Sequence, residues 1–242
     1  MNAPAIEFRH TSYRVDGRVV LGPLSLAVAT GDVLVLLGRS GSGKTTALRL
    51  INGLLLPTAG EVLVQGRSTS AWDPVRLRRG IGYVIQEVGL FPHMSVERNV
   101  GVVPRLERWP APRIRARVTE LLALVGLPAG DFAARLPHQL SGGQRQRVGV
   151  ARALAADPPV LLCDEPFGAV DPLARAELQA EFKALTARLR RTVVFVTHDV
   201  REALALASRI AVLEDGQLHF CGSPGEFQTS DDPHVRALRE SA

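Results

Sequence analysis

The segment LVLLGRSGSGKTT, Leu34 to Thr46, decides the fold of this chain. It begins within an apolar run, Val33 to Leu37, which predicts a short strand buried on both faces. The strand ends at glycines with the spacing Gly-x-x-x-x-Gly-Lys-Thr, which is the spacing of a phosphate-binding loop. A chance glycine-rich turn is the alternative. A turn that follows a buried strand and precedes a helix favours nucleotide binding instead.

Three kinds of residue in this loop suit it to a chain of phosphates. The glycines let backbone N–H groups turn inward, and no Cβ blocks an approaching oxyanion. Lys44 supplies positive charge for the β- and γ-phosphates, and the Thr45 hydroxyl is a candidate ligand of Mg²⁺. A helix predicted over residues 46–54 directs its positive N-terminal end at the same anion. The predicted nucleotide-binding residues here are Gly38, Arg39, Ser40, Gly41, Ser42, Gly43, Lys44, Thr45 and Thr46.

Composition indicates a globular protein with enough apolar material for a large core. Of the 242 residues, 46% are hydrophobic, and the mean hydropathy is +0.09. No run approaches the ~20 apolar residues of a membrane span. The start, MNAPAIEFRH, lacks the layout of a secretory signal, so we expect a cytosolic protein. Cys163 and Cys221 have no ligand spacing around them, which favours buried or incidental thiols.

The basic isoelectric point, near 10.0, accompanies a net charge of only +5. Lys44 and Lys183 are the only lysines, so nearly all of the 29 basic residues are arginines, and a small excess of arginine raises the isoelectric point. Apart from short clusters at 76–79 and 188–191, these residues are scattered along the chain. Scattered charge indicates a solvated surface rather than a nucleic-acid interface.

Strands that alternate with helices predict an α/β fold with a parallel sheet and crossover helices. Residues 5–30 differ, because breaks at Asp16-Gly17 and Gly22-Pro23 predict two or three antiparallel strands. Prolines between residues 87 and 139 separate amphipathic segments, which indicates a helical insertion. We expect one domain, with a core of residues 1–86 and 146–242 and a helical subdomain of residues 87–145. Other strands are predicted over 61–65, 81–86, 160–163, 192–197, 210–213 and 217–220, and helices over 114–125, 141–156, 173–189 and 200–207.

A second apolar strand ends in charge at VLLCDE, Val160 to Glu165. In open α/β sheets, ligands bind outside the carboxyl ends of the strands, so Asp164 is expected to reach the Mg²⁺ shell. Glu165 is the candidate general base that polarises the attacking water beside the γ-phosphate. The alternative is two carboxylates that only cap a strand, and the phosphate-binding loop upstream argues against it.

The segment LSGGQ, Leu140 to Gln144, is the second specific signal. Ser141 and Gln144 have the spacing of a capping box at the start of a helix. The glycine-flanked N–H groups and the helix dipole then form a second anion site. A single phosphate-binding loop does not need such a site on its own chain. Two copies arranged head to tail do need it, with Ser141 of each copy completing the site of the other.

These motifs, in this order, resemble the ATP-binding subunits of ABC transporters over about Ile6 to Phe227. The resemblance implies a RecA-like P-loop NTPase core with an N-terminal antiparallel β-subdomain and an inserted helical subdomain. It implies ATP and Mg²⁺ as cofactors, with Ser141, Gly142, Gly143 and Gln144 contacting nucleotide. The implied partners are a second nucleotide-binding subunit and transmembrane permease subunits, with a substrate-binding protein acting indirectly and no nucleic acid. The implied location is the cytoplasmic face of the membrane.

The resemblance also implies roles for two residues that follow the motifs. Gln86 matches the glutamine that touches Mg²⁺ and links nucleotide to the transmembrane partner, and Val170-Asp171 matches a loop between two active sites. Each has an alternative. Gln86 is also explained as a polar residue at a strand end, and Asp171 as a helix N-cap ahead of Pro172.

Two ring side chains gain roles in the same way. His198, in FVTHD, matches a histidine that holds the γ-phosphate and water in register, and Tyr13 lies where an aromatic residue stacks on adenine. A lone histidine is usually structural, but one at the end of a buried strand lies beside the phosphate-binding loop by the logic of a parallel sheet. Phe8 competes with Tyr13 for the adenine.

A finer resemblance is to the ATPases of quaternary-amine importers, for glycine betaine, choline or carnitine. It rests on IGYVIQEVGLFPHMSVERNV, VPRLERW and LSGGQRQRVGVARALAADPPVLLCDEPFGAVDP. Residues 81–100 would then receive the permease. Arg39 replaces a usual proline, and Cys163 and Val170 stand where Met and Leu are common, but no catalytic group is lost. The chain ends near Ala242 without the tandem regulatory domain of some of these ATPases, so such regulation is not assumed.

Other classes fit the sequence less well. An ATPase for another small solute, such as an amino acid, stays open. A non-transport ABC ATPase acting on DNA or ribosomes is the rival that the basic isoelectric point favours. Chromosome-structuring ATPases carry a long coiled coil before the LSGGQ segment, and ribosome-acting ones fuse two cassettes; this chain has neither. A P-loop kinase or switch GTPase leaves LSGGQ and His198 without a purpose.

Overall fold

The computed structural model describes residues 4–86, 89–168 and 172–240. Contacts divide the chain into two units. The first comprises residues 1–78 and 190–242, and the second comprises residues 79–189. The second unit is therefore inserted into the first. Among the described residues, no helix combines the length and the apolar character needed to cross a bilayer.

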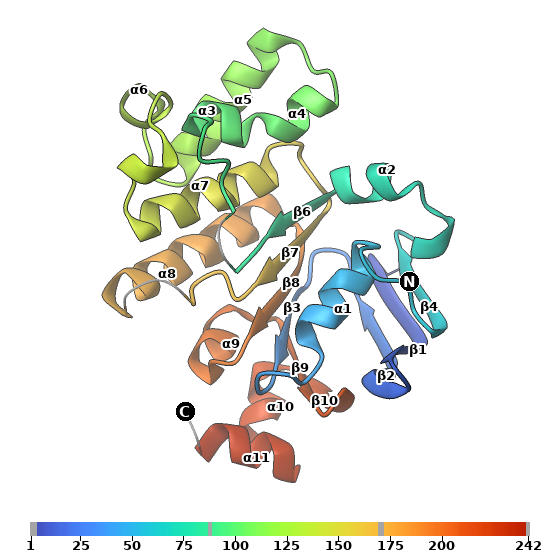
Figure 1. The fold of residues 1–242 in the computed structure, drawn as a ribbon. Coiled ribbons are helices and arrows are strands. Elements are labelled where there is room, and N and C mark those ends of the chain that lie inside the picture. The colour runs from blue at the N-terminus through green and yellow to red at the C-terminus, as the bar shows by residue number, and fades with distance from the viewer. Residues whose placement is uncertain (1–3, 87–88, 169–171, 241–242) are drawn as a thin grey trace. The chain divides into compact units, whose positions relative to one another are not determined.

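An antiparallel sheet of order β2-β1-β4-β5 opens the first unit (Figure 1). Asp16 and Gly17, both with positive φ, form the tight turn between β1 and β2, a sequence typical of hairpins. The predicted antiparallel strands of residues 5–30 are thus confirmed as two, with Ile6 opposite Val28. The strands are β1 (Ile6–Val15), β2 (Arg18–Val28), β4 (Ala59–Val64) and β5 (Arg67–Ser68).

The second sheet region of this unit has the strand order β10-β9-β3-β8. The predicted strand β3 (Val33–Leu37) lies between two parallel neighbours, which explains why its sequence is apolar without alternation. Hydrogen bonding aligns Leu37 with Thr197 on β8 and with Val212 on β9. The other strands of this sheet region are β8 (Thr192–Thr197), β9 (Arg209–Glu214) and β10 (Gln217–Gly222). Strand β10 is antiparallel to β9.

Helices of the first unit pack against these strands. The helix after the phosphate-binding loop is α1 (Lys44–Ile51), which begins two residues earlier than predicted. Two C-terminal helices were not predicted; the first of them starts with a capping box between Ser223 and Glu226. The remaining helices are η1 (Thr69–Ala71), α2 (Pro74–Arg79), α9 (Val200–Leu206), α10 (Pro224–Thr229) and α11 (Pro233–Glu240).

The second unit contains a parallel strand pair, β6 (Ile81–Val84) and β7 (Val160–Asp164). The predicted strand 81–86 ends at Val84, so Gln86 lies in a bend beyond it. Gly82 is required on β6, because a Cβ there would lie 2.5 Å from the carbonyl oxygen of Ala153. The strand can thus lie close to the C-terminal end of α7.

Helices make up most of the second unit, as the proline-rich segment predicted. The helices α3 and α5 pack on α7, and α8 packs on α7 as well (Figure 1). Buried leucines and valines such as Val118, Leu122 and Val148 form the core between them. The helices are α3 (Val96–Val100), α4 (Val102–Leu106), α5 (Ala111–Leu124), α6 (Ala129–Phe132), η2 (Pro137–Gln139), α7 (Gly142–Leu154) and α8 (Pro172–Leu189).

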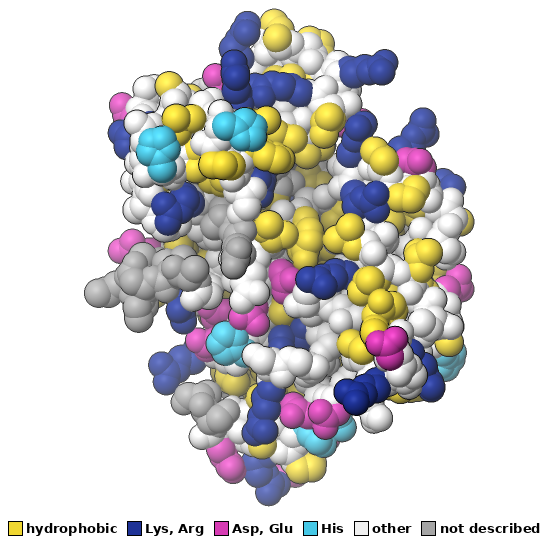
Figure 2. All heavy atoms as spheres, in the orientation of Figure 1, with side chains coloured by type: hydrophobic (Ala, Val, Ile, Leu, Met, Phe, Trp, Pro, Cys, Tyr) yellow, Lys and Arg dark blue, Asp and Glu magenta, His cyan; other side chains and the backbone are white. Residues whose placement is uncertain are grey.

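The basic side chains are scattered over the visible surface, as the sequence predicted. Figure 2 shows Lys and Arg side chains, in dark blue, dispersed over the visible face and interspersed with Asp and Glu. No single basic patch dominates the view of Figure 2. The scattered arrangement predicted from sequence is therefore what the visible face presents.

Candidate active site

The loop between β3 and α1 has the conformation that its glycines predict. Gly41 and Gly43 have positive φ, at 85° and 96°. A Cβ on Gly38 would lie 2.1 Å from the carbonyl oxygen of Leu213, and a Cβ on Gly43 would lie 2.8 Å from that of Val20. The two glycines thus allow close backbone approach, while the tip of the loop stays exposed.

Lys44 is almost fully buried at the start of α1, with 4% exposure. Its Nζ donates hydrogen bonds to the carbonyl oxygens of Gly38, at 2.8 Å, and of Arg39, at 2.7 Å. The ammonium group is therefore held against the backbone of the loop whose N–H groups are predicted to hold phosphates. Such a preorganised charge stabilises an anion without reorganisation.

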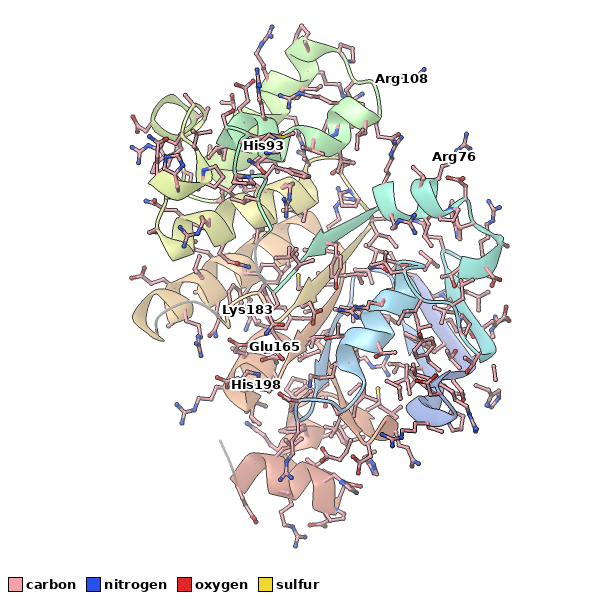
Figure 3. The ribbon with its side chains drawn as sticks, viewed as in Figure 1. Arg76, His93, Arg108, Glu165, Lys183 and His198 are labelled. Carbon is pink, nitrogen blue, oxygen red and sulfur yellow. The ribbon has the colours of Figure 1, made fainter. Side chains whose placement is uncertain are left out.

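His198 lies immediately after β8 and is exposed. Because Leu37 and Thr197 are aligned in register on parallel strands, Gly38 and His198 leave the same edge of the sheet beside each other. The structure therefore brings the predicted histidine and the predicted phosphate-binding loop together within the first unit. Figure 3 labels His198 just beyond the end of β8.

A hydrogen-bond network fixes the turn that presents His198. The Thr197 hydroxyl donates to Oε2 of Glu202, at 2.6 Å, and accepts from the Asp199 N–H, at 3.0 Å. Asp199 caps α9 by accepting from the N–H groups of Arg201 and Glu202. Sequence reasoning missed this network. The spacing Asp199-x-x-Glu202, which is typical of a helix start, was the available signal.

Asp164 is the last residue of β7, and Glu165 follows it directly. Asp164 is 6% exposed, and its Oδ2 accepts a hydrogen bond from the Tyr83 hydroxyl, at 3.2 Å. Tyr83 was not predicted as a site residue, because its contact with Asp164 joins two strands that lie far apart in the sequence. The hydroxyl orients a carboxylate that lies at the carboxyl end of its strand.

Glu165 has a left-handed backbone conformation, with φ of 42°. This conformation is uncommon for a residue with a Cβ, and such outliers concentrate at functional sites. A turn hydrogen bond from the Gly168 N–H to the Glu165 carbonyl oxygen, at 3.1 Å, supports it. Figure 3 places Glu165 just beyond the end of β7.

Gln86 and the carboxylates share one edge of the second unit. Val84 is aligned with Cys163 on the parallel strands, and Gln86 and Asp164 each come shortly after these residues. Gln86 is exposed, which leaves its amide accessible to a ligand or to a partner.

The LSGGQ segment, Leu140 to Gln144, is called the signature segment here, and it begins α7 with the predicted capping box. The Ser141 hydroxyl accepts from the Gln144 N–H, at 3.2 Å, and the Gln144 side chain accepts from the Ser141 N–H, at 3.0 Å. Ser141 and Gly142 are exposed, whereas Gly143 and Gln144 are half-buried. The N-terminal end of this helix therefore faces solvent.

The remaining predicted residues have mixed outcomes. Phe8 is 3% exposed and belongs to the core, whereas Tyr13 is half-buried on β1 and keeps an accessible surface. Of the two, only Tyr13 has surface that a ligand can reach, and its contact with adenine stays a prediction. Val170 and Asp171 lie outside the described residues.

Both thiols have environments that hold them protonated. Cys163 is fully buried, and burial raises its pKa above the usual range. Burial also raises the pKa of the Cys221 thiol, against the opposing effect of the Arg209 guanidinium, which donates a hydrogen bond to Sγ at 3.0 Å. The expectation of buried or incidental thiols agrees with the burial of Cys163, whereas Cys221 is half-buried.

The donor set suits Mg²⁺ bound together with phosphates. Mg²⁺ prefers one or two carboxylates with phosphate oxygens and water over a cage made of protein alone. Among the described residues, no group of three or more His, Cys, Asp or Glu side chains forms such a cage. The predicted ligands are all oxygen donors. Thr45 lies in the first turn of α1 in the first unit, and Gln86 and Asp164 lie at or just beyond strand ends in the second unit.

These features define the chain as a P-loop NTPase of the α/β class. Its family follows from comparison with known proteins: the model of the ABC transporter family matches residues 21–168, and the chain belongs to that family.

Known relatives agree with this assignment. The chain is 52% identical over 204 residues to the osmoprotectant import ATP-binding protein OsmV of Salmonella typhimurium, covering 84% of this chain and 53% of that protein. It is 48% identical over 211 residues to the glycine betaine/carnitine/choline transport ATP-binding protein OpuCA of Bacillus subtilis, covering 87% and 55%. The chain thus spans about half the length of these relatives.

A solved structure shows the same fold. The dimeric structure of a post-hydrolysis state of the ATP-binding cassette MJ0796, bound to ADP and Pi, is 33% identical and superimposes with a TM-score of 0.80. The superposition covers 90% of this chain and 98% of that one.

Proposed function

We propose that the chain is the ATP-hydrolysing subunit of an ABC importer, with quaternary-amine osmoprotectants such as glycine betaine or choline as the solute. The observation that carries the proposal is the exposed, capped signature helix on a chain that already has a phosphate-binding loop. A second anion site on one chain has a use when two copies share their nucleotides. The relatives named for osmoprotectant import support the choice of solute.

In this proposal the first unit binds the triphosphate. Backbone N–H groups of residues 38–46 hold the β- and γ-phosphates, Lys44 neutralises their charge, and Tyr13 stacks on adenine. Mg²⁺, when bound, neutralises phosphate oxygens and orients them. His198, fixed by the Thr197–Glu202 bond, holds the γ-phosphate and the attacking water in register.

The second unit supplies the remaining groups. Glu165 accepts a proton from the water molecule that attacks the γ-phosphate. Asp164 and Gln86 would be ligands of Mg²⁺. Ser141, Gly142, Gly143 and Gln144 donate to the γ-phosphate held by a second copy, and Asp171 lies between the two sites. The chain acts at the cytoplasmic face of the membrane on permease subunits, which a substrate-binding protein supplies with solute.

The division into a core of residues 1–86 and 146–242 and a helical subdomain of residues 87–145 is part of this proposal. The contact units have their boundaries near residues 78 and 190 instead. The helical subdomain would receive the permease through the segment that follows Gln86.

The enzymatic part is tested with Glu165→Gln. Removing a general base lowers the rate by ~10²–10⁴-fold. We expect the variant to bind ATP with unchanged affinity and to accumulate as a dimer, measured by light scattering. Glu177→Gln, which removes an exposed carboxylate of α8, is the control and keeps the wild-type rate. A Glu165→Gln chain that stays monomeric at saturating ATP contradicts the shared-site proposal.

The solute is tested in liposomes that contain this chain, its permease and its binding protein. Glycine betaine, choline or carnitine should stimulate ATP hydrolysis several-fold over an equal concentration of sulfate or an amino acid. Stimulation by one of the latter instead assigns the chain to another importer. Co-purification with ribosomes or DNA, without a permease, assigns it to the non-transport class.

A further inference from the structure

Tyr83, near the end of β6, carries a polar group that the proposed function does not use. Its ring hydroxyl donates a hydrogen bond to Oδ2 of Asp164, at 3.2 Å. Tyr83 is half-buried, and Asp164 is 6% exposed. The proposed function assigns Asp164 to Mg²⁺. A hydroxyl bound to one of its two oxygens therefore affects how this carboxylate can meet a metal ion.

The register of two strands in the second unit brings this pair together. Tyr83 lies opposite Leu162 on the parallel pair of β6 and β7. Leu162 and Asp164 are two residues apart on β7, so their side chains lie on the same face of that strand. The long side chain of Tyr83 reaches the second of them along this face. Paired strands, rather than loops, thus position both the hydroxyl and the carboxylate.

Metal ions differ in how they use a carboxylate. A carboxylate with one oxygen held by a hydroxyl can bind a metal through its other oxygen, which is monodentate binding. Mg²⁺ demands near-ideal octahedral geometry at about 2.0–2.1 Å, whereas Ca²⁺ accepts six to eight oxygens at about 2.3–2.6 Å and takes one or both oxygens of a carboxylate. The hydrogen bond from Tyr83 to Asp164 therefore suits Mg²⁺ and opposes bidentate binding of Ca²⁺.

We propose that Tyr83 is a positioning residue that sets metal selectivity: its hydroxyl holds Asp164 as a monodentate ligand and so favours Mg²⁺ over Ca²⁺. Hydrogen-bond partners of metal ligands commonly change metal affinity by ~10–100-fold. This role of Tyr83 rests on the proposed function of Asp164 as a ligand of Mg²⁺.

The test measures metal binding directly, without hydrolysis. Mn²⁺, which oxygen ligands also bind in octahedral geometry, is added to the full chain with ADP, the protein being in excess over the nucleotide. Electron paramagnetic resonance measures the Mn²⁺ that remains free in solution. Mg²⁺ or Ca²⁺ is then titrated in to displace the bound Mn²⁺, which gives a Kd for each ion. The ratio of the Ca²⁺ Kd to the Mg²⁺ Kd is the selectivity.

Tyr83→Phe removes the hydroxyl and keeps the ring. We expect the Mg²⁺ Kd to rise by about tenfold, the lower end of the usual range, because 3.2 Å is long for a hydroxyl donor. The Ca²⁺ Kd should stay the same or fall, because Oδ2 of Asp164 is no longer held by the phenol. Thr119→Val, which removes an exposed hydroxyl of α5, is the control and leaves both values unchanged.

Asp164→Asn shows whether Tyr83 acts through this carboxylate. We expect this variant alone to raise the Kd of both ions, because a charged ligand is lost. In the double variant, Tyr83→Phe should cause no further change in the selectivity, since no carboxylate remains for the hydroxyl to orient.

Two outcomes overturn the role of Tyr83 alone. The same selectivity in wild type and Tyr83→Phe, whether or not both Kd values change, shows that the hydroxyl does not select the metal ion. The same change of selectivity with and without the Asp164 carboxylate shows that Tyr83 acts elsewhere. Unchanged Kd values in Asp164→Asn contradict the proposed function of Asp164 itself, and with it the role of Tyr83, so the two failures are distinguishable.

Discussion

Lys44 holds a buried positive charge at the start of the helix that follows the phosphate-binding loop. Its ammonium group lies within 2.8 Å of two loop carbonyl oxygens. We expect Lys44→Ala to lower the ATPase rate by at least ~10²-fold, because a preorganised charge at the phosphates is lost. Lys183→Ala removes the other lysine of the chain, which is exposed on α8, and serves as the control. Comparable rates for the two variants would contradict the assignment of the loop.

Thr197 is a positioning residue for His198. Thr197→Val removes the hydroxyl that donates to Glu202 and accepts from the Asp199 N–H. We expect the free energy of unfolding, measured in urea, to fall by about 1–3 kcal/mol, because Glu202 stays buried without this donor. The kcat for ATP hydrolysis should fall with little change in KM. Thr197→Ser, which keeps the hydroxyl, should restore both the kcat and the free energy of unfolding. Thr58→Val, which removes an exposed hydroxyl, is the control.

Glu226 gives the first unit a pH-dependent stability. Hydrogen bonds from the Ser223 N–H and hydroxyl hold the pKa of this carboxyl below its usual value. A carboxyl with a lowered pKa in the folded state stabilises the protein above its unfolded pKa, and this stabilisation is lost as pH falls through the folded value.

The wild type should therefore have a higher urea midpoint than Glu226→Gln at neutral pH. The difference between the midpoints should shrink as pH is lowered from about 7 toward about 3. A constant difference over this range would show that the carboxylate charge has no part in the capping box.

At the scale of elements, β6 depends on a glycine. Gly82→Ala places a Cβ 2.5 Å from the Ala153 carbonyl oxygen and 2.8 Å from Cδ1 of Leu161. We expect the urea-unfolding free energy to fall by about 1–3 kcal/mol, as for other overpacked sites. Gly130→Ala, on α6 with no atom within 4 Å of the new Cβ, is the control and should gain up to about 1 kcal/mol.

Elements with strong local signals were predictable. The strand Val33–Leu37 and the strand Thr192–Thr197 have the predicted bounds, because each is a continuous apolar run between turn residues. The capping box of Ser141 and Gln144 was likewise readable from spacing alone. Local chemistry decides these features, so one segment of sequence contains the whole signal.

Features that depend on distant segments were not predictable. Tyr83 meets Asp164 across the β6–β7 pair, and no local pattern announces a contact between residues so far apart in the sequence. The strand predicted over 81–86 ends early, because pairing with β7 runs only as far as Val84. Helices α10 and α11 are only six and eight residues long, so each offers few turns over which a helical pattern can be recognised.

At the scale of the molecule, two copies are expected to share each nucleotide. In the Glu165→Gln background, Ser141→Ala should weaken ATP-dependent dimerisation by about tenfold or more, because a hydrogen bond to a charged group is lost. Ser223→Ala is the matched control, since it also removes a capping-box hydroxyl but at α10. Analytical ultracentrifugation with and without ATP measures both. Equal weakening by the two variants would show that only helix stability is involved.

The strand that carries the phosphate-binding loop is synthesised early and paired late. Both neighbours of β3, namely β8 and β9, follow the inserted second unit in the sequence. At ~5–20 residues per second, the ribosome takes roughly ten to thirty seconds to reach them. During that interval the backbone N–H and C=O groups at both edges of β3 have no neighbouring strand to pair with in the nascent chain. Slow translation after residue 37 prolongs this exposure, which makes this stretch the natural target of a chaperone.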